Sequence, residues 1–411
     1  MRLSLLLPRE PFPVIFEQTL SRFLRSWTGR PYEIHWRPQR PLFASPARSG
    51  EFWLVNSYLN AIFIPQADPA ILGPVKQEFS RSLSWWRRGP QRLYVDMATS
   101  PLTAPWLAHA WVSLTPALPR AELLLMVAGN HKIRLLDYGE KTVYAIRKCG
   151  FPPTFLEREI EVRRQTEELG LPVPRIKTVA GDGAWLSEAY VNGAPVNRLK
   201  QPAQARAAFA EAHQALQVLH RHTWREVDAN EYVDLLSTEA HTHIEHIEAN
   251  ALISSGSKGS FIQTLASLVA RIKALRPTGG DRLPTVLAHG DFQPANILVD
   301  ADRLWLIDWE YAGRRQAAYD LLTYKLESRF TRGLSGRFQK FIAQGIPDGG
   351  LWPDFSCYAN GWQDSRSRLF YGLLFLLEEL ALRLEENDNP AFIQMDSGLQ
   401  ILQREISQCL K

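Results

Sequence analysis

The 411-residue sequence is poor in cysteine, and this scarcity excludes several classes of protein. Its three cysteines, Cys149, Cys357 and Cys409, are far apart in the chain and odd in number. They match no zinc-binding spacing and no disulfide framework of the kind that stabilises small secreted domains. A reducing compartment is the simplest interpretation, so we expect the protein to be cytoplasmic.

Long apolar runs are absent as well. The apolar stretch after Met1 stops at Pro8-Arg9-Glu10 with no small-residue cleavage site, so it does not match a secretory signal. The most apolar segment elsewhere, residues 369–377, is nine residues long. A membrane-spanning helix needs ~20 such residues, so we expect no transmembrane segment. Internal repeats and long low-complexity tracts are also lacking.

The net charge of +4 is small, but it is unevenly distributed. Residues 1–120 hold 14 Lys/Arg and 7 Asp/Glu, a balance of +7, which leaves −3 for the rest. The same part holds seven of the 13 tryptophans. A basic, tryptophan-rich part joined to a mildly acidic part indicates two different roles.

Four prolines between residues 101 and 119 predict a domain boundary near residue 120. Before it we expect a mixed α/β segment, with a helix over 13–28 and strands over 32–36, 52–55 and 93–95. After it we expect strands over 123–127, 132–136, 142–147 and 185–191, a helix from the capping box of Thr154 and Glu157, and long helices from residue 204. The predicted domains are 1–120, of unknown role; 121–193, a small β-rich lobe; and 194–411, a larger helical lobe.

The strongest motif is His289-Gly290-Asp291 followed by Asn296, with Ile307-Asp308-Trp309-Glu310 shortly after it. Phosphoryl transfer needs a carboxylate that orients the acceptor hydroxyl and accepts its proton, and oxygen ligands that hold magnesium against the phosphates. An Asp and an Asn five residues apart on one loop, with a second Asp after the next strand, supply these groups. A capped surface turn would also contain Asp and Asn, but it does not require this spacing.

H-G-D-x-x-x-x-N followed by I-D-W-E resembles the aminoglycoside phosphotransferase and choline kinase family. The resemblance implies an α+β, bilobal protein-kinase-like fold, here preceded by a separate mixed α/β N-terminal domain, and the use of ATP and Mg²⁺. It makes Asp291 the catalytic base, Asn296 and Asp308 the metal ligands, and His289 a structural residue at the site. Glu310 is a further candidate polar contact.

A kinase also needs a cation on the phosphates and a carboxylate that holds it. The strand over 142–147 ends at Arg147, which fits the usual register of the family, and Lys148 follows it on the opposite face. We prefer Arg147 and keep Lys148 as the alternative. Glu159 falls on the mainly apolar face of the next predicted helix, so we expect it to pair with a buried cation rather than extend to water.

Two further segments are assigned to nucleotide binding by the resemblance. Gly129 and Asn130 stand where the family has its phosphate-covering loop, although the sequence has no G-x-G-x-x-G there. Glu188 and Tyr190 stand at the family's hinge, where backbone groups contact adenine. Read alone, the segment around Glu188 fits an ordinary buried strand equally well.

Two other patterns admit a functional and a plain interpretation. His241, His243 and His246 could bind a metal, but H-x-H places two imidazoles about 200° apart on a helix, so we favour a solvated helix face. Trp85-Trp86-Arg87-Arg88 could face an anionic lipid, glycan or nucleic acid. For this segment we favour tryptophans packed inward and solvated arginines.

The sequence therefore predicts a phosphotransferase that moves the γ-phosphate of a nucleoside triphosphate to a hydroxyl of a small molecule or a sugar or glycan. Acidic residues such as Asp364, Glu378 and Glu379 are candidates to face a cationic acceptor. The alternative is a catalytically silent, kinase-like scaffold or anionic-ligand-binding protein that works through its basic N-terminal part. We expect no DNA partner.

Overall fold

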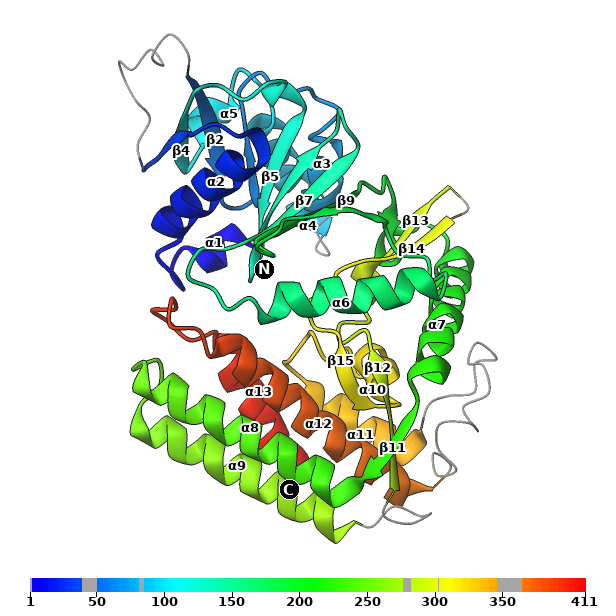
Figure 1. Cartoon of the computed structure of the whole chain (residues 1–411). Coiled ribbons are helices and arrows are strands. Elements are labelled where there is room, and N and C mark those ends of the chain that lie inside the picture. The colour runs from blue at the N-terminus through cyan, green and yellow to red at the C-terminus, as the bar shows by residue number, and fades with distance from the viewer. Residues whose placement is uncertain (1, 39–49, 81–84, 276–281, 302, 346–363) are drawn as a thin grey trace. The chain divides into compact units, whose positions relative to one another are not determined.

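The computed structural model describes residues 2–38, 50–80, 85–275, 282–301, 303–345 and 364–411 (Figure 1). The chain divides into two compact units, and each is described by itself. Residues 1–156 and 175–190 form the sheet unit, and residues 157–174 and 191–411 form the helical unit. None of the described helices is both long enough and apolar enough to cross a membrane.

The sheet unit is organised around a nine-stranded sheet with the order β1-β4-β2-β3-β5-β6-β7-β9-β8 (Figure 1). Its strands are β1 Glu33–Arg37, β2 Glu51–Asn56, β3 Ala61–Phe63, β4 Ala110–Thr115, β5 Leu124–Ala128, β6 Lys132–Asp137, β7 Thr142–Arg147, β8 Ile176–Val179 and β9 Trp185–Ala189. Its helices are α1 Leu3–Leu6, α2 Phe12–Thr28, α3 Gly73–Phe79, α4 Trp85–Ala98 and α5 Ala104–Leu107.

Helix α2 forms because its apolar residues recur at helical spacing and bury one face. Phe12, Phe16, Leu20 and Phe23 are buried in the core that the sheet unit shares. The helix ends at Gly29, whose φ of +72° is the left-handed conformation that glycine adopts without a steric penalty. The helix lies against β1 and β7, so residues from both sides of the expected boundary at 120 share one core.

The separate N-terminal domain expected over 1–120 is therefore not confirmed. Strand β3 pairs with β5 at Ile62 and Met126, which joins the early strands to the later ones in a continuous sheet. The proline-spaced stretch expected to be a boundary contains β4, which lies between β1 and β2. The strand expected over 93–95 is wrong, because these residues belong to helix α4. A three-residue apolar run carries too little periodicity to separate a strand from a helix.

The other predicted strands agree with the structure to within one or two residues, and β7 has the predicted bounds Thr142–Arg147. Helix α6, Thr154–Glu168, begins at the residue of the predicted capping box. The chain passes from the sheet unit to the helical unit within this helix and again after Tyr190.

The helical unit packs its long helices around α12, whose residues are buried along most of their length (Figure 1). Its helices are α7 Pro202–Thr223, α8 Ala229–Ala249, α9 Ser255–Ala274, α10 Tyr319–Lys325, α11 Leu334–Gln344, α12 Ser365–Asn387 and α13 Ser397–Cys409. Two three-stranded sheets complete it: β10 Ala194–Pro195 with β13 Ile297–Asp300 and β14 Arg303–Leu306, and β11 Arg225–Asp228 with β12 Arg282–Ala288 and β15 Gly313–Gln316. The small β-rich and larger helical regions expected from the sequence are both present.

Candidate active site

The loop that carries the H-G-D motif follows β12, and one buried carboxylate binds its backbone. Asp320, at the start of α10, is fully buried and accepts hydrogen bonds from the backbone amides of His289 at 2.7 Å and Gly290 at 2.9 Å. His220 of α7 contacts the same carboxylate at 3.3 Å. Burial opposes ionisation of Asp320, but these contacts outweigh it and its pKa is lowered. Asp320 is therefore a stable anion that fixes the backbone of the loop.

Gly290 is required by the shape of this loop. Its φ is +81°, and a Cβ atom added there would lie 1.9 Å from the carbonyl oxygen of Tyr311. No side chain fits in that space without moving the backbone. The small residue between His289 and Asp291 thus lets two segments of main chain pass in close contact.

His289 lies fully buried behind the loop. Its Nε2 contacts the carbonyl oxygen of Ile307 at 3.1 Å, and its ring packs 4.3 Å from that of Trp309. Burial lowers the pKa of His289, although Asp320, Asp291 and Asp308 act in the opposite sense. A buried position of this kind suits a structural residue. The charges of Asp291, Asp308 and Asp320 all act on the imidazole of His289.

Both carboxylate oxygens of Asp291 are held in place. Asn296 donates to Oδ2 at 2.7 Å and Gln293 donates to the same atom at 2.9 Å. Arg329 binds Oδ1 through Nε and also donates to the carbonyl oxygen of Gly290. Its Nη1 binds Glu379 of α12 at 2.7 Å. The carboxylate of Asp291 is therefore oriented by side chains from its own loop and by one distant arginine.

Asn296 and Asp308 come together because of a hairpin. Strands β13 and β14 pair with Ile297 opposite Leu306, so the residues just outside that pair lie at one end of the hairpin. The amide of Ile307 donates to the carbonyl oxygen of Asn296 at 3.0 Å. Asp308 has φ +69°, an uncommon conformation for a residue with a side chain and one that concentrates at functional sites.

These groups suit magnesium. Asn296 uses its Nδ2 to donate to Asp291, which leaves its amide oxygen as the atom that can face a metal. Asp308 supplies a carboxylate from the same end of the hairpin. Oxygen donors are what Mg²⁺ prefers, and it keeps several waters besides one or two protein ligands.

In the sheet unit, the predicted phosphate-covering loop is the turn between β5 and β6. The amide of Gly129 donates to the carbonyl oxygen of Lys132 at 2.9 Å, and a Cβ at Gly129 would come within 2.9 Å of that oxygen. Asn130 is the next residue of this turn, and the ring of His131 stacks on Phe155 at 3.7 Å. The loop is a tight hairpin turn, whose role in nucleotide binding stays a prediction.

The structure separates the two candidate cations at the end of β7. Lys148 is completely buried and binds Glu10 at 2.5 Å, with its ammonium group 4.9 Å from the centre of the Phe151 ring. Arg147 is partly exposed, and its carbonyl oxygen accepts from Arg22. Lys148 is therefore held in the interior of the sheet unit, and the choice of Arg147 for the phosphates stays a prediction. The sequence analysis did not identify Glu10 as the partner of Lys148.

Glu159 lies on α6 in the helical unit and is 3% exposed, so the expectation that it is buried is confirmed. Its ion pair within that unit is with Arg163, 3.9 Å away and one helical turn along. Its pairing with a phosphate-binding cation stays a prediction.

The predicted hinge residues end β9. Glu188 stands in the strand opposite Val143 of β7, and the amide of Tyr190 donates to the carbonyl oxygen of Lys141 at 3.0 Å. The ring of Tyr190 lies 4.9 Å from that of Tyr138. These contacts join Glu188 and Tyr190 to the neighbouring part of the sheet, and the adenine contact stays a prediction.

A cavity of about 570 Å³ adjoins Asp291 within the helical unit. Two of its lining residues, Gln293 and Arg329, are the ones that bind the Asp291 carboxylate. Its remaining lining residues are Asn197, Pro294, Ala295, Thr323, Tyr324, Lys325, Glu327 and Phe330. The sequence analysis identified neither Arg329 nor the pocket. Arg329 lies 38 positions from Asp291 and belongs to no motif.

The acidic residues expected to face a cationic acceptor have other partners. Glu378 is fully buried and accepts from Tyr232 at 2.6 Å and from Gln316. Glu379 holds Arg329. Asp364 caps α12 by accepting from the amide of Ser367 at 2.8 Å. The expectation of an acidic acceptor surface at these three residues is therefore not supported.

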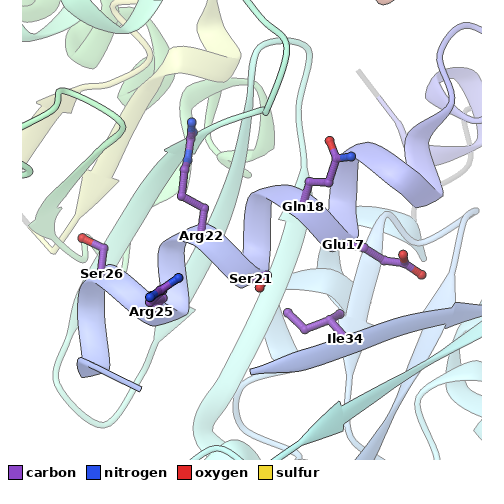
Figure 2. A pocket seen from close by; sticks show the side chains of 7 residues that line it. All are labelled: Glu17, Gln18, Ser21, Arg22, Arg25, Ser26 and Ile34. Carbon is purple, nitrogen blue, oxygen red and sulfur yellow. The ribbon is translucent and has the colours of Figure 1, made fainter. Parts of the chain in front are cut away.

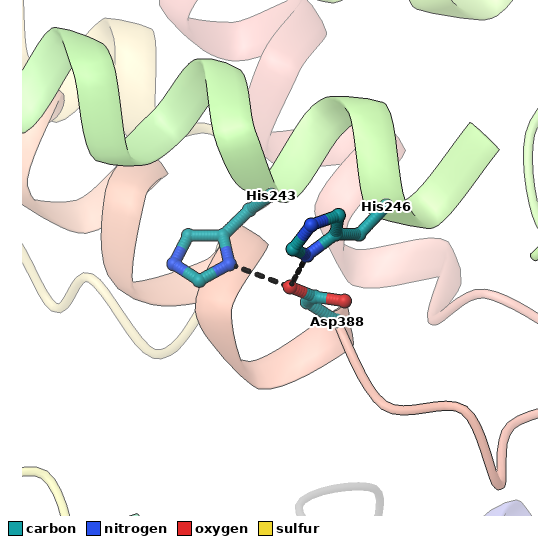
Figure 3. A group of neighbouring side chains, drawn as sticks. All are labelled: His243, His246 and Asp388. Carbon is teal, nitrogen blue, oxygen red and sulfur yellow. Dashed lines mark hydrogen bonds and ion pairs between the residues drawn. The ribbon is translucent and has the colours of Figure 1, made fainter. Parts of the chain in front are cut away.

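Two histidines of the cluster contact one carboxylate. His243 and His246 both contact Oδ2 of Asp388 through Nδ1, at 2.8 and 2.9 Å (Figure 3). His241 contacts the carbonyl oxygen of Ser237 instead. Two ligands of one tetrahedral zinc ion would be roughly 3.4 Å apart, so the observed distances are those of hydrogen bonds. His243 and His246 are thus joined to α12 rather than simply solvated as expected.

A second depression, of about 670 Å³, lies along α2 in the sheet unit (Figure 2). It is lined by Glu17, Gln18, Ser21, Arg22, Arg25, Ser26 and Ile34. Glu17 accepts from the backbone amide of Trp36, and Ser26 accepts from the indole of Trp185. The depression holds none of the predicted site residues.

Comparison with known proteins identifies the family of the chain. The model of the phosphotransferase enzyme family matches residues 128–349, more than half of the chain. The chain therefore belongs to this family. No curated protein sequence matches it.

Solved structures that resemble the chain include kinases with two kinds of acceptor. A choline/ethanolamine kinase family protein from Mesorhizobium loti has 16% identity over 78% of this chain and 93% of its own, with a TM-score of 0.42. Choline kinase LicA from Streptococcus pneumoniae has 15% identity over 71% and 91%, with a TM-score of 0.39. A thermostable mutant of aminoglycoside phosphotransferase APH(4)-Ia has 14% identity over 70% and 93%, with a TM-score of 0.45.

Proposed function

We propose that the chain transfers the γ-phosphate of Mg·ATP to a hydroxyl group of a small molecule. The observation that carries this proposal is the orientation of Asp291 by Asn296, Gln293 and Arg329, next to a cavity and on the same loop as the metal-binding candidates. A fixed carboxylate beside a pocket is what orientation of an acceptor hydroxyl requires.

Asp291 orients the hydroxyl and accepts its proton as the hydroxyl oxygen bonds to the γ-phosphorus, while the bond from the γ-phosphorus to the β,γ-bridging oxygen breaks and ADP leaves. Asn296 and Asp308 would hold Mg²⁺, which when bound neutralises charge on the phosphates. Arg329 lies between Asp291 and Glu379 and offsets the repulsion between their carboxylates. In the sheet unit, Arg147, Gly129, Asn130, Glu188 and Tyr190 keep the nucleotide-binding roles that the resemblance gives them.

The composition of the cavity supports an acceptor that is neutral. Its charged lining residues are Lys325, Glu327 and Arg329, and the charge of Arg329 is already balanced by Asp291 and Glu379. The amides of Asn197 and Gln293 can exchange hydrogen bonds with hydroxyls, and the rings of Tyr324 and Phe330 offer apolar faces. A sugar or polyol fits these groups better than a polycation does.

The test combines a binding assay with a transfer assay on the full chain. Mg·ATP is expected to raise the unfolding temperature of the wild type by mass action, and Asp308→Asn is expected to abolish most of that shift. Asp300→Asn, at the other end of the same hairpin, is the matched control and should keep the shift. Asp291→Asn should keep nucleotide binding and lose transfer by about 10²–10⁴-fold.

The scaffold alternative predicts a different set of results. A chain that binds no Mg·ATP while folded, or that binds it and phosphorylates no sugar, polyol or amino alcohol, would contradict the proposed activity. Transfer that is equally fast in Asp291→Asn would contradict the role of that residue alone.

A further inference from the structure

Large apolar side chains on the outside of the molecule concentrate in one short segment of the sheet unit. Of the eleven large hydrophobic residues that are exposed in the described part of the chain, five lie between residues 86 and 106. Their exposed fractions are 59% for Trp86, 62% for Leu93, 40% for Met97, 84% for Leu102 and 74% for Trp106. Single exposed hydrophobic residues are common, but a cluster of this kind marks an interaction surface.

Helical geometry places the first three on one line. At 100° per residue, Trp86, Leu93 and Met97 of α4 fall within about 40° of one another, and Pro90 adjoins them. Val95 and Ala98 are buried on the other side of the helix. Helix α4 therefore carries an apolar stripe that faces outward. Leu102 and Trp106 are exposed in the turn after α4 and in α5, the helix that packs against α4. We call this set of residues the α4–α5 face.

Arginines flank the stripe of α4. Arg87 lies over the ring of Trp86, with its guanidinium carbon 4.5 Å from the ring centre, and Arg92 is exposed on the other flank, whereas Arg88 is exposed on the side of the helix away from the stripe. Asp96 is the single acidic residue of α4. Tryptophan and arginine side by side are typical of elements that lie at the boundary between water and lipid, where the ring reaches the acyl region and the cation stays with the phosphates.

A cavity of about 500 Å³ opens beside this face. Its walls include Tyr58 and Tyr94, whose rings are 5.4 Å apart, and its polar groups include Arg87 and His109. Aromatic walls with a cation at the edge provide room for a phosphorylated head group next to the apolar stripe.

We propose that the α4–α5 face docks the protein on the surface of a membrane that contains anionic phospholipids. The apolar stripe enters the interfacial layer, and the arginines bind lipid phosphates. A second copy of the chain fits the same face less well. In a two-fold contact the patch meets itself, which brings the arginines of both copies together, whereas an anionic bilayer neutralises them.

The test is co-sedimentation of the full chain with vesicles of phosphatidylcholine alone and with vesicles in which about a third of the lipid is phosphatidylglycerol. We expect binding to the anionic vesicles, and at least tenfold weaker binding to the neutral ones and at about 0.5 M NaCl. The variant Trp86→Glu/Trp106→Glu should lose binding by tenfold or more. Leu235→Glu, which changes an exposed leucine of α8, should bind as the wild type does.

Other results would overturn the proposal. Equal binding by the double variant, or no binding to anionic vesicles by the folded wild type, would contradict docking through this face. A dimer in solution that the double variant converts to a monomer would assign the face to a second copy of the chain. The Mg·ATP-induced shift of the unfolding temperature, measured on the same samples, reports folding and nucleotide binding independently of lipid.

Discussion

The catalytic loop and the nine-stranded sheet are built in opposite ways. The groups predicted for chemistry in the helical unit lie within residues 289–308, and a hairpin and one turn bring them together. The sheet is assembled from strands between residues 33 and 189, and its pairs β1–β4, β2–β4 and β3–β5 join segments that are far apart in sequence. The spacing of residues along the sequence therefore predicts the H-G-D loop, but it says little about the order of the strands in the sheet.

The two regions also differ in how they accommodate buried charge. In the helical unit, Asp291, Arg329 and Glu379 form a chain of alternating charges beside a cavity. In the sheet unit, Lys148 and Glu10 form an ion pair with both side chains fully buried. A buried pair is costly to break, because the remaining partner keeps its charge without compensation. The first arrangement serves a site, and the second fixes the N-terminal segment to the sheet.

The largest effect that would sharpen this comparison is expected at Gly290. Gly290→Ala places a Cβ against the carbonyl oxygen of Tyr311, so we expect the free energy of unfolding to fall by more than about 4 kcal/mol, or the catalytic loop to rearrange. Urea unfolding of the full chain measures this. Gly313→Ala is the control, since a Cβ there meets no atom within 4 Å. Equal stability of the two variants would contradict the close contact.

A somewhat smaller effect is expected in the sheet unit. Lys148→Met leaves Glu10 buried without its cation, so the free energy of unfolding should fall by about 3–5 kcal/mol. Burial raises the pKa of Glu10 even with Lys148 beside it, so the unpaired acid should become protonated. The double variant Glu10→Gln/Lys148→Met should recover a large part of the loss. A double variant as unstable as the single one would show that the lysine acts through packing alone.

The smallest effect concerns pH and the polar core around the catalytic loop. Burial lowers the pKa of His213 to about 4, with His220 acting in the same sense and Asp320 in the opposite one. Between that value and the ordinary 6.5 the unfolded chain binds the extra proton. The free energy of unfolding should therefore fall by about 1.4 kcal/mol per pH unit as the pH drops below about 6.5.

Denaturant unfolding of wild type and His213→Phe across this range checks that prediction. The variant should lose the part of the slope that His213 causes. His222→Phe, which removes an exposed imidazole from the same helix, should keep the wild-type slope. An unchanged slope in His213→Phe would contradict the assignment.

The sequence predicted elements well where periodicity extended over several residues and poorly where it did not. Strand β7 and helix α2 have the expected bounds to within one residue, because each presents a clear apolar pattern. The strand expected over 93–95 is part of α4, and β4 was hidden in a proline-spaced stretch. Trp86 was expected to pack inward and is exposed, because the face that a helix buries depends on its neighbours.

The sequence by itself determined the H-G-D motif, the strand that separates Asn296 from Asp308, and membership in a phosphotransferase family, because these depend on residues close together in the chain. Only the tertiary structure decided that Glu10 meets Lys148, that Arg329 holds Asp291, and that one sheet spans the expected domain boundary. These contacts join residues tens to more than a hundred positions apart. Such pairs are selected by packing and by the cost of leaving a buried charge unpaired, and neither leaves a local pattern in the sequence.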